Sequence, residues 1–263
     1  VACWGNDRLS NVPFLTNPTH VDAGFGHACV IDSSGVVCWG DNSDGQTNVP
    51  SLSNPTGVSA GRYHTCAIEN SDVVCWGNDS LTSYSNKPVL TNVKSVVAAE
   101  QHTCALDDNG VHCWGVDGFG AATVPPLTNP IQVDTRDGHT CALDKNGLTC
   151  WGFNSSGQID VPDNLAFTNT VTLSGSTTTS TDDSSSSNDS GSSSGSSNSS
   201  NISEMSLTTR FSHTCALDDN GVQCWGRNEW GQSTVPSLSN PTQISAGSYH
   251  TCALDDNGVQ CWG

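Results

Sequence analysis

The sequence predicts an all-β protein, a β-propeller built from blades of about 37 residues, and three observations carry this prediction. The segment "HTCALDDNGVQCWG" occurs at 213–226 and again at 250–263, with the near copy "HTCALDDNGVHCWG" at 102–115. The first cysteine of each copy recurs in steps of 37, 38, 37, 74 and 37, and a constant period of this length indicates a solenoid, a propeller or another array. No helical periodicity of apolar residues accompanies the repeat, which favours the propeller.

Each repeat begins with two short strands, "HTCAL" and "VQCWG", on either side of "DDNG". Asn-Gly favours a tight hairpin, because glycine takes a positive φ without steric cost. With 107–110 as the loop, Leu106 faces Val111 and Cys104 faces Cys113, close enough for a disulfide. We therefore expect one disulfide in each hairpin: Cys29–Cys38, Cys66–Cys75, Cys104–Cys113, Cys141–Cys150, Cys215–Cys224 and Cys252–Cys261. One copy has Asp72 in place of the glycine, and there we expect a looser turn.

The rest of the repeat, for example "GQTNVPSLSNPTGVSAG" at 45–61, is a polar turn followed by a proline-containing stretch. Proline excludes helix and suits loops or sheet edges. "GVSAG" and "QISAG" then supply a further short strand before the next His-Thr-Cys. The predicted blade is antiparallel and four-stranded.

Seven "CWG" strands but six "H-x-C" strands are present, which suggests a seven-bladed ring or a section of a longer array. In the ring interpretation, residues 1–171 form the first blades and 207–263 the last ones. The final closing strand is then missing, and Cys3 is left unpaired. Residues 172–206 are rich in Ser, Thr and Asn and are predicted to be a disordered insertion or tether, because they bury too little apolar surface to order.

The motifs "AG-x-x-H-T-x-A-L" and "G-x-x-x-W-G-x-N-x-x-G-Q" resemble the repeat of the regulator of chromosome condensation family, which forms seven-bladed propellers. The short form with "GQTNVP" and "GQSTVP" is most similar to the secreted type II β-lactamase inhibitory proteins. The resemblance implies the fold and leaves the function open, since the repeat serves many roles. The paired cysteines depart from both and resemble those of secreted bacterial versions of the repeat.

Charge and cysteine usage limit the partners and the compartment. Twenty-six acidic residues against eight basic ones leave a net charge of -18, which argues against nucleic-acid partners and anionic membrane surfaces. The chain contains no apolar run long enough for membrane insertion. Hairpin disulfides require an oxidising compartment, so we expect an extracellular or cell-surface protein, with the periplasm as the alternative. Candidate glycosylation sites are Asn78, Asn154, Asn188, Asn198 and Asn201.

Three patterns allow a chemical and a structural interpretation. His64, Cys66 and Cys75 could hold zinc, or form a disulfide beside a histidine bonded to a loop backbone. The repeated tryptophans could stack on carbohydrate, or form core. The Asp pairs such as 107–108 could ligate calcium, although no twelve-residue calcium loop is present, or serve as turn residues. The structural interpretation is favoured each time. No nucleophile–base pair or phosphate loop occurs, so we predict no enzyme activity, catalytic residue, metal or cofactor.

Two positions vary most among the copies: the residues just before the histidine and those after Trp-Gly. Rotational symmetry gathers each set into a ring on one face, where aromatic and arginine side chains suit protein binding; ordinary variation of solvated loops is the alternative. The candidate binding residues are Arg62, Tyr63, Phe119, Phe211, Arg227, Trp230 and Tyr249. The predicted function is a non-enzymatic adhesion or binding module for a protein or glycan. Inhibition of a secreted enzyme such as a β-lactamase, and self-association as a structural unit of an extracellular array, are the alternatives.

Overall fold

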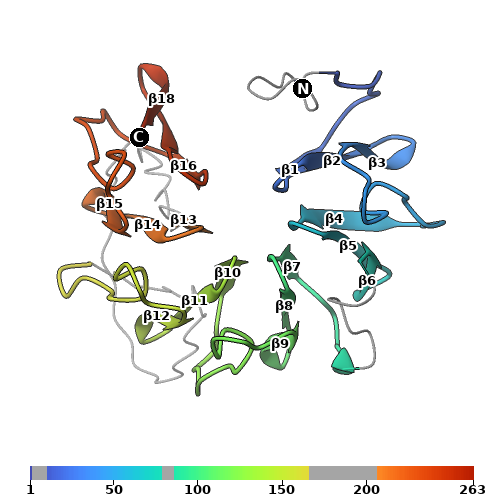
Figure 1. Cartoon of the computed structure of the whole chain (residues 1–263), viewed down its shortest axis with the longest axis horizontal. Coiled ribbons are helices and arrows are strands. Elements are labelled where there is room, and N and C mark those ends of the chain that lie inside the picture. The colour runs from blue at the N-terminus through green and yellow to red at the C-terminus, as the bar shows by residue number, and fades with distance from the viewer. Residues whose placement is uncertain (2–10, 79–85, 166–205) are drawn as a thin grey trace, which may run out of the picture.

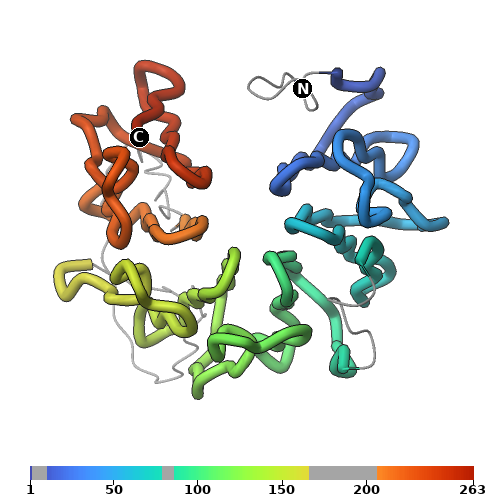
Figure 2. The backbone as a smooth tube through the Cα atoms, viewed as in Figure 1, coloured from blue at the N-terminus to red at the C-terminus, as the bar shows by residue number. Residues whose placement is uncertain are grey.

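The computed structural model describes residues 1, 11–78, 86–165 and 206–263. Within these ranges it contains six antiparallel three-stranded sheets, called blades below, each formed by consecutive strands. The blades follow one another in chain order around a ring that is open between the first and the last of them (Figures 1 and 2). The protein is thus all-β and propeller-like, as predicted.

Each blade has an inner strand near the ring centre, a middle strand and an outer strand (Figure 1). The inner strands are β1 (His20–Ala23), β4 (Pro55–Ala60), β7 (Ser95–Ala98), β10 (Gln132–Arg136), β13 (Ser206–Arg210) and β16 (Gln243–Ala246). The middle strands are β2 (His27–Asp32), β5 (His64–Glu69), β8 (His102–Asp107), β11 (His139–Asp144), β14 (His213–Asp218) and β17 (Thr251–Asp255). The outer strands are β3 (Gly35–Gly40), β6 (Asp72–Gly77), β9 (Gly110–Gly115), β12 (Gly147–Gly152), β15 (Gly221–Gly226) and β18 (Gly258–Trp262).

The blades differ from the prediction in their strand number, with three strands where four were expected. The described part of the stretch after an outer strand, such as 41–54, forms turns and irregular chain instead of a fourth strand. Its prolines, Pro50 among them, lack the N–H that a sheet ladder needs. Six blades lie within the described residues. Cys3 and the tract 172–206 lie outside those residues, so the expectations placed on them stay predictions.

The hairpin between the middle and outer strands has the predicted register. Leu106 pairs with Val111 and Cys104 with Cys113, and the equivalent pairs recur in all six described hairpins. Direct opposition brings the paired Cα atoms to 4.0–4.1 Å, and the six predicted disulfides are all formed. Because Cys66 is bonded to Cys75, the zinc alternative at His64 is wrong.

The turn without glycine is as tight as the others, so the expectation of a looser turn is wrong. Glu69 still pairs with Asp72 across a two-residue turn. In that turn Asn70 and Ser71 take φ values of 51° and 68°. Positive φ at both central residues is the type I′ geometry, which follows the twist of a hairpin. Elsewhere the glycine at the start of the outer strand carries the positive φ, 128° at Gly110.

The core lies between neighbouring blades. One buried layer joins Cys66, Ile68 and Val73 of one blade to Val96 and Trp114 of the next. Trp39, Trp76, Trp114, Trp151 and Trp225 are buried, which confirms the core interpretation for these tryptophans.

A hydrogen-bonded relay also crosses each described blade boundary. The Thr65 hydroxyl donates to the Gln46 carbonyl at 2.8 Å and therefore accepts a hydrogen bond from His27 Nε2, also at 2.8 Å. Trp76 Nε1 donates to the same carbonyl at 2.9 Å. The same histidine–threonine pair recurs at the next four boundaries. The histidine partner is thus a threonine of the next blade, whereas the sequence analysis expected a loop backbone.

Candidate functional site

Two sets of loops meet at one end of the ring, and we call this end the loop face. One set joins the inner to the middle strands, and the other follows the outer strands. Backbone hydrogen bonds tie the two sets together: Asp41 N to Gly26 O at 2.7 Å, Val116 N to Gln101 O at 2.8 Å, Phe153 N to Gly138 O at 2.8 Å and Arg227 N to Ser212 O at 2.7 Å. The two variable positions of the repeat therefore share one face.

Aromatic and arginine side chains form two groups on the loop face. In the first group, the Arg62 guanidinium lies 4.5 Å from the centre of the Phe25 ring and 5.1 Å from that of Tyr63. In the second, Tyr249 lies 5.9 Å from Phe211 and 6.4 Å from Trp230 between ring centres. Five of the seven predicted residues thus lie in these two groups, and Phe119 and Arg227 lie outside them.

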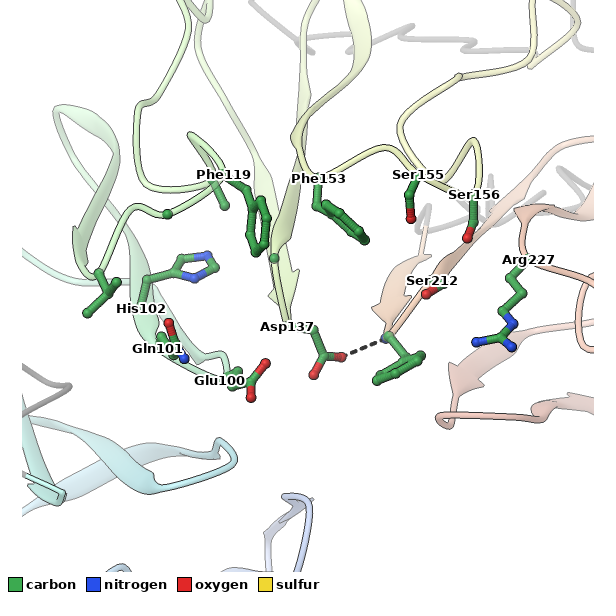
Figure 3. Close-up of a pocket in the computed structure, with 15 residues that line it drawn as sticks. Glu100, Gln101, His102, Phe119, Asp137, Phe153, Ser155, Ser156, Ser212 and Arg227 are labelled. Atoms are coloured by element: carbon green, nitrogen blue, oxygen red, sulfur yellow. Dashed lines mark hydrogen bonds between the residues drawn. The ribbon is translucent and has the colours of Figure 1, made fainter.

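A cavity of about 340 Å³ lies on the same face between the third, fourth and fifth described blades (Figure 3). Phe119, Phe211 and Arg227 of the predicted set line it, while Arg62, Tyr63, Trp230 and Tyr249 do not. The Phe119 and Phe153 rings are 4.7 Å apart at a 50° angle. Figure 3 shows these rings and the carboxylates of Glu100 and Asp137 directed toward the same space.

Two carboxylates give the cavity its charge. Burial raises the pKa of Asp137, whose Oδ2 accepts the Phe211 N–H at 2.8 Å. Burial also raises the pKa of Glu100, and the nearby Asp137 charge adds to this effect, while Arg62, 2.7 Å away, opposes it. The backbone is strained at the same place, because Asp137 and Phe211 have φ values of 51° and 42°.

Sequence reasoning missed a polar cluster at the ring centre. Arg136 donates to the carbonyls of Ala60 at 2.5 Å and Ala98 at 3.3 Å, and to both carboxylate oxygens of Asp22 at 3.2 Å. Arg210 donates to the carbonyl of Ala23 at 2.7 Å. These two arginines join the fourth and fifth described blades to the first three.

The sequence of the repeat already distinguishes these two arginines from the residues at the same position in the other copies. Arg136 and Arg210 occupy the position that other copies fill with Gly24, Gly61, Ala99 or Gly247. At Gly24 a Cβ atom would lie 2.1 Å from the carbonyl oxygen of Gly61, and the three described blades with glycine at this position all pack too closely for a Cβ atom there. Burial lowers the pKa of Arg210 to about 10, and the Arg136 charge contributes to the shift.

The remaining candidates have structural contacts. Asn78 Nδ2 donates to Asp44 at 2.6 Å, and Asn154 Nδ2 donates to Asp160 at 2.8 Å. The other three candidate glycosylation sites lie outside the described residues. Asp107, of the Asp pair considered for calcium, accepts the N–H groups of its own turn at Asn109 and Gly110, which is the predicted turn role.

Among the described residues, no group of three or more His, Cys, Asp or Glu side chains is arranged to hold a metal ion. In the same ranges the structure has no helix long and apolar enough to span a bilayer.

Comparison with known proteins identifies the repeat. The family model of the regulator of chromosome condensation (RCC1) repeat matches residues 19–46, 132–158 and 242–263. No curated protein sequence matches the chain.

Solved structures of three proteins are similar in fold. The ectodomain of the Physcomitrella patens receptor kinase CR4 has a TM-score of 0.67 and 23% identity over 95% of this chain, which spans 63% of that ectodomain. The CRINKLY WD40 ectodomain of the Arabidopsis thaliana receptor kinase ACR4 has a TM-score of 0.62 and 19% identity, covering 95% of this chain and 83% of that one.

Prp20p of Saccharomyces cerevisiae, described with its binding to Gsp1p and histones, has a TM-score of 0.68 and 16% identity, covering 94% of this chain and 72% of that one. Identities of 16–23% show a similar fold alone. Three segments of this chain thus match the regulator of chromosome condensation repeat, and its ring of blades is similar in fold to these structures.

Proposed function

We propose that this protein is a non-enzymatic, extracellular or cell-surface binding module that recognises a protein or glycan through its loop face. The observation that carries the proposal is the gathering of exposed aromatic side chains there. Four of them are between 51% and 66% exposed: Phe25, Phe119, Trp230 and Tyr249. Aromatic residues and arginine dominate the energetics of protein interfaces, and exposed apolar groups of this kind mark binding sites.

The extracellular location rests on chemistry. Six disulfides in short hairpins persist in an oxidising environment and are rare in the cytosol. The shared fold with two plant receptor-kinase ectodomains is consistent with this location.

A structural unit of an extracellular assembly is the second candidate. Val259 is 63% and Leu254 37% exposed on the last described blade. Their equivalents Val222 and Leu217 pack against the following blade. Sedimentation equilibrium distinguishes this candidate, because reversible self-association that V259D abolishes would support it.

The binding proposal is tested with a glycan array and a panel of purified secreted proteins that includes a β-lactamase. For any ligand bound by the wild type, we expect the W230A/Y249A double variant to bind about 30-fold more weakly, since loss of a hot spot costs about 2 kcal/mol. I131A is the matched control, because Ile131 is 61% exposed beside the hairpin turn at Gly110, away from the loop face. Equal binding by both variants would overturn the proposal.

A further inference from the structure

The acidic side of the loop-face cavity holds a carboxylate, that of Asp137, which forms no ion pair with the described residues. Asp137 accepts one hydrogen bond, from the Phe211 N–H. Burial disfavours the charge of this half-buried side chain, and the charges of Arg210, Arg136 and Arg62 offset this effect only in part, because the pKa of Asp137 stays raised. A cation entering the cavity would therefore gain more here than at an exposed carboxylate.

A second carboxylate, that of Glu100, makes the binding of a cation in the cavity more favourable. The Glu100 side chain is 24% exposed and shares the cavity with Asp137, while its single ion pair is with Arg62 at the rim. The charge of Asp137 acts unfavourably on Glu100. A cation between the two would relieve both the repulsion and the unpaired charge.

The walls of the cavity suit an organic cation. The rings of Phe119 and Phe153 lie side by side over the same space (Figure 3), with 4.7 Å between their centres. Phe211 also lines the cavity. Aromatic faces attract ammonium and guanidinium groups, most strongly where water is excluded. A volume of about 340 Å³ lies at the lower end of ligand-binding cavities, which fits one long side chain.

The surrounding charges favour the same ligand. Arg227 lines the cavity but is paired with Glu229, and Arg62 is paired with Glu100. The net charge of -18 attracts cationic partners over a longer range.

We infer that this cavity binds the lysine or arginine side chain of a basic peptide segment presented by a protein ligand. The inference deepens the proposed function and rests on the loop face being the binding surface. It assigns recognition of the cation to Asp137 and Glu100, with Phe119 and Phe153 as the aromatic walls.

The test measures fluorescence polarisation of labelled pentapeptides, Gly-Gly-X-Gly-Gly, in which X is Lys, Arg or Gln. We expect the Lys and Arg peptides to bind at least tenfold more tightly than the Gln peptide. D137N should remove this preference, and E100Q should reduce it. An Asn side chain at 137 can still accept the Phe211 N–H and tolerates a positive φ. Intact mass verifies that the new Asn-Gly pair has not deamidated.

D163N is the matched control, because it removes one negative charge from an exposed side chain outside the cavity. Equal effects of D137N and D163N, or no preference for Lys and Arg over Gln, would overturn the inference. Tighter binding of a chitosan oligomer than of the Lys peptide would overturn the assignment to a peptide. The two proposals fail separately: a ligand lost on W230A/Y249A but kept by D137N supports the binding module and contradicts the cation site.

Discussion

At the scale of the residue, the threonine of the His-Thr-Cys segment links two blades through its hydroxyl group. The Thr65 hydroxyl has one proton, which it gives to the Gln46 carbonyl, so its oxygen receives the proton of His27 Nε2. This arrangement determines the neutral tautomer of the histidine. Thr65 and His27 are fully buried, so neither group has water as a substitute partner.

We predict that T65V destabilises the protein by about 1–3 kcal/mol, because His27 Nε2–H and the Gln46 carbonyl each lose a buried partner. T65S keeps the hydroxyl and should cost less. Urea unfolding of both variants measures the difference. A loss for T65V no larger than that for T65S would show that the hydroxyl relay contributes no more to stability than the packing of the methyl group.

The buried histidines predict a pH dependence of stability. Burial lowers the pKa from 6.5 to about 3 in His64 and His139, and to about 4 in His27, His102 and His213. Below pH 6.5 the unfolded chain binds protons that the folded chain excludes, so stability falls as the pH drops from 6.5 toward 4. The loss approaches about 1.4 kcal/mol per pH unit for each histidine. Urea midpoints at pH 7.5, 6.5, 5.5 and 4.5 measure it, and a constant midpoint over this range would contradict the relay.

At the scale of the element, the disulfide hairpin is the repeated unit. Its register, its turn and its covalent link all lie within fourteen residues such as 102–115. Each disulfide closes a loop of the same length, with a sequence separation of 9. Each disulfide therefore restricts the unfolded chain to the same extent, and this effect adds the same free energy of stabilisation in every blade.

We predict that C252A/C261A costs roughly 2–3 kcal/mol, the loop-closure contribution alone. C66A/C75A should cost more, because Cys66 is completely buried and its removal leaves a cavity, whereas Cys252 is half-buried. Guanidinium unfolding of the two double variants compares them. A loss in neither variant would show that the blade interfaces alone set the stability.

At the scale of the whole molecule, the ring centre links blades that are distant in the chain. Arg136 bonds Asp22, 114 residues away, and Ala60, 76 residues away. Burial alone would raise the pKa of Asp22, but the charges of Arg136 and Arg210 lower it below its usual value. The central arginines therefore act as ties across the ring.

We predict that R136A destabilises the protein by about 3 kcal/mol, because it removes the cation paired with the Asp22 carboxylate and the side-chain donor to two backbone carbonyls. Amide exchange should increase in β1, β4 and β7 before the outer strands. R227A removes an arginine from a surface pair and should cost less than about 1 kcal/mol. Similar losses of unfolding free energy for R136A and R227A would contradict the conclusion that Arg136 ties the blades together at the ring centre.

Local features were predictable from the sequence because the contacts that define them join neighbouring residues. The hairpin register, the six disulfides and the buried tryptophans followed from the nine-residue cysteine spacing and the 37-residue period. The number of strands in each blade was not predictable in this way. The proline-containing stretch has short segments that look like strands in the sequence, but its prolines lack the N–H groups that a fourth strand would need for pairing.

The sequence predicted that the candidate binding residues share one face of the ring, but it did not predict which of them line a common cavity. Variation among the copies pointed to the loops that hold Phe119, Phe211 and Arg227. Which of them share a space depends on how neighbouring blades rotate against each other, and the sequence pattern carries no such information. The contact between Asp137 and Phe211 spans 74 residues, including the tract 172–206.

By itself the sequence determined the repeated element: a tight, disulfide-linked hairpin that packs its tryptophan against a neighbour. The tertiary structure alone decided that the histidine meets a threonine 38 residues later, that two arginines fill the ring centre, and that two carboxylates and two phenylalanine rings face one cavity. The physical reason is the range of the contacts. Hairpin pairs are set by register within one segment, whereas these sites exist only once separate blades have packed in a ring.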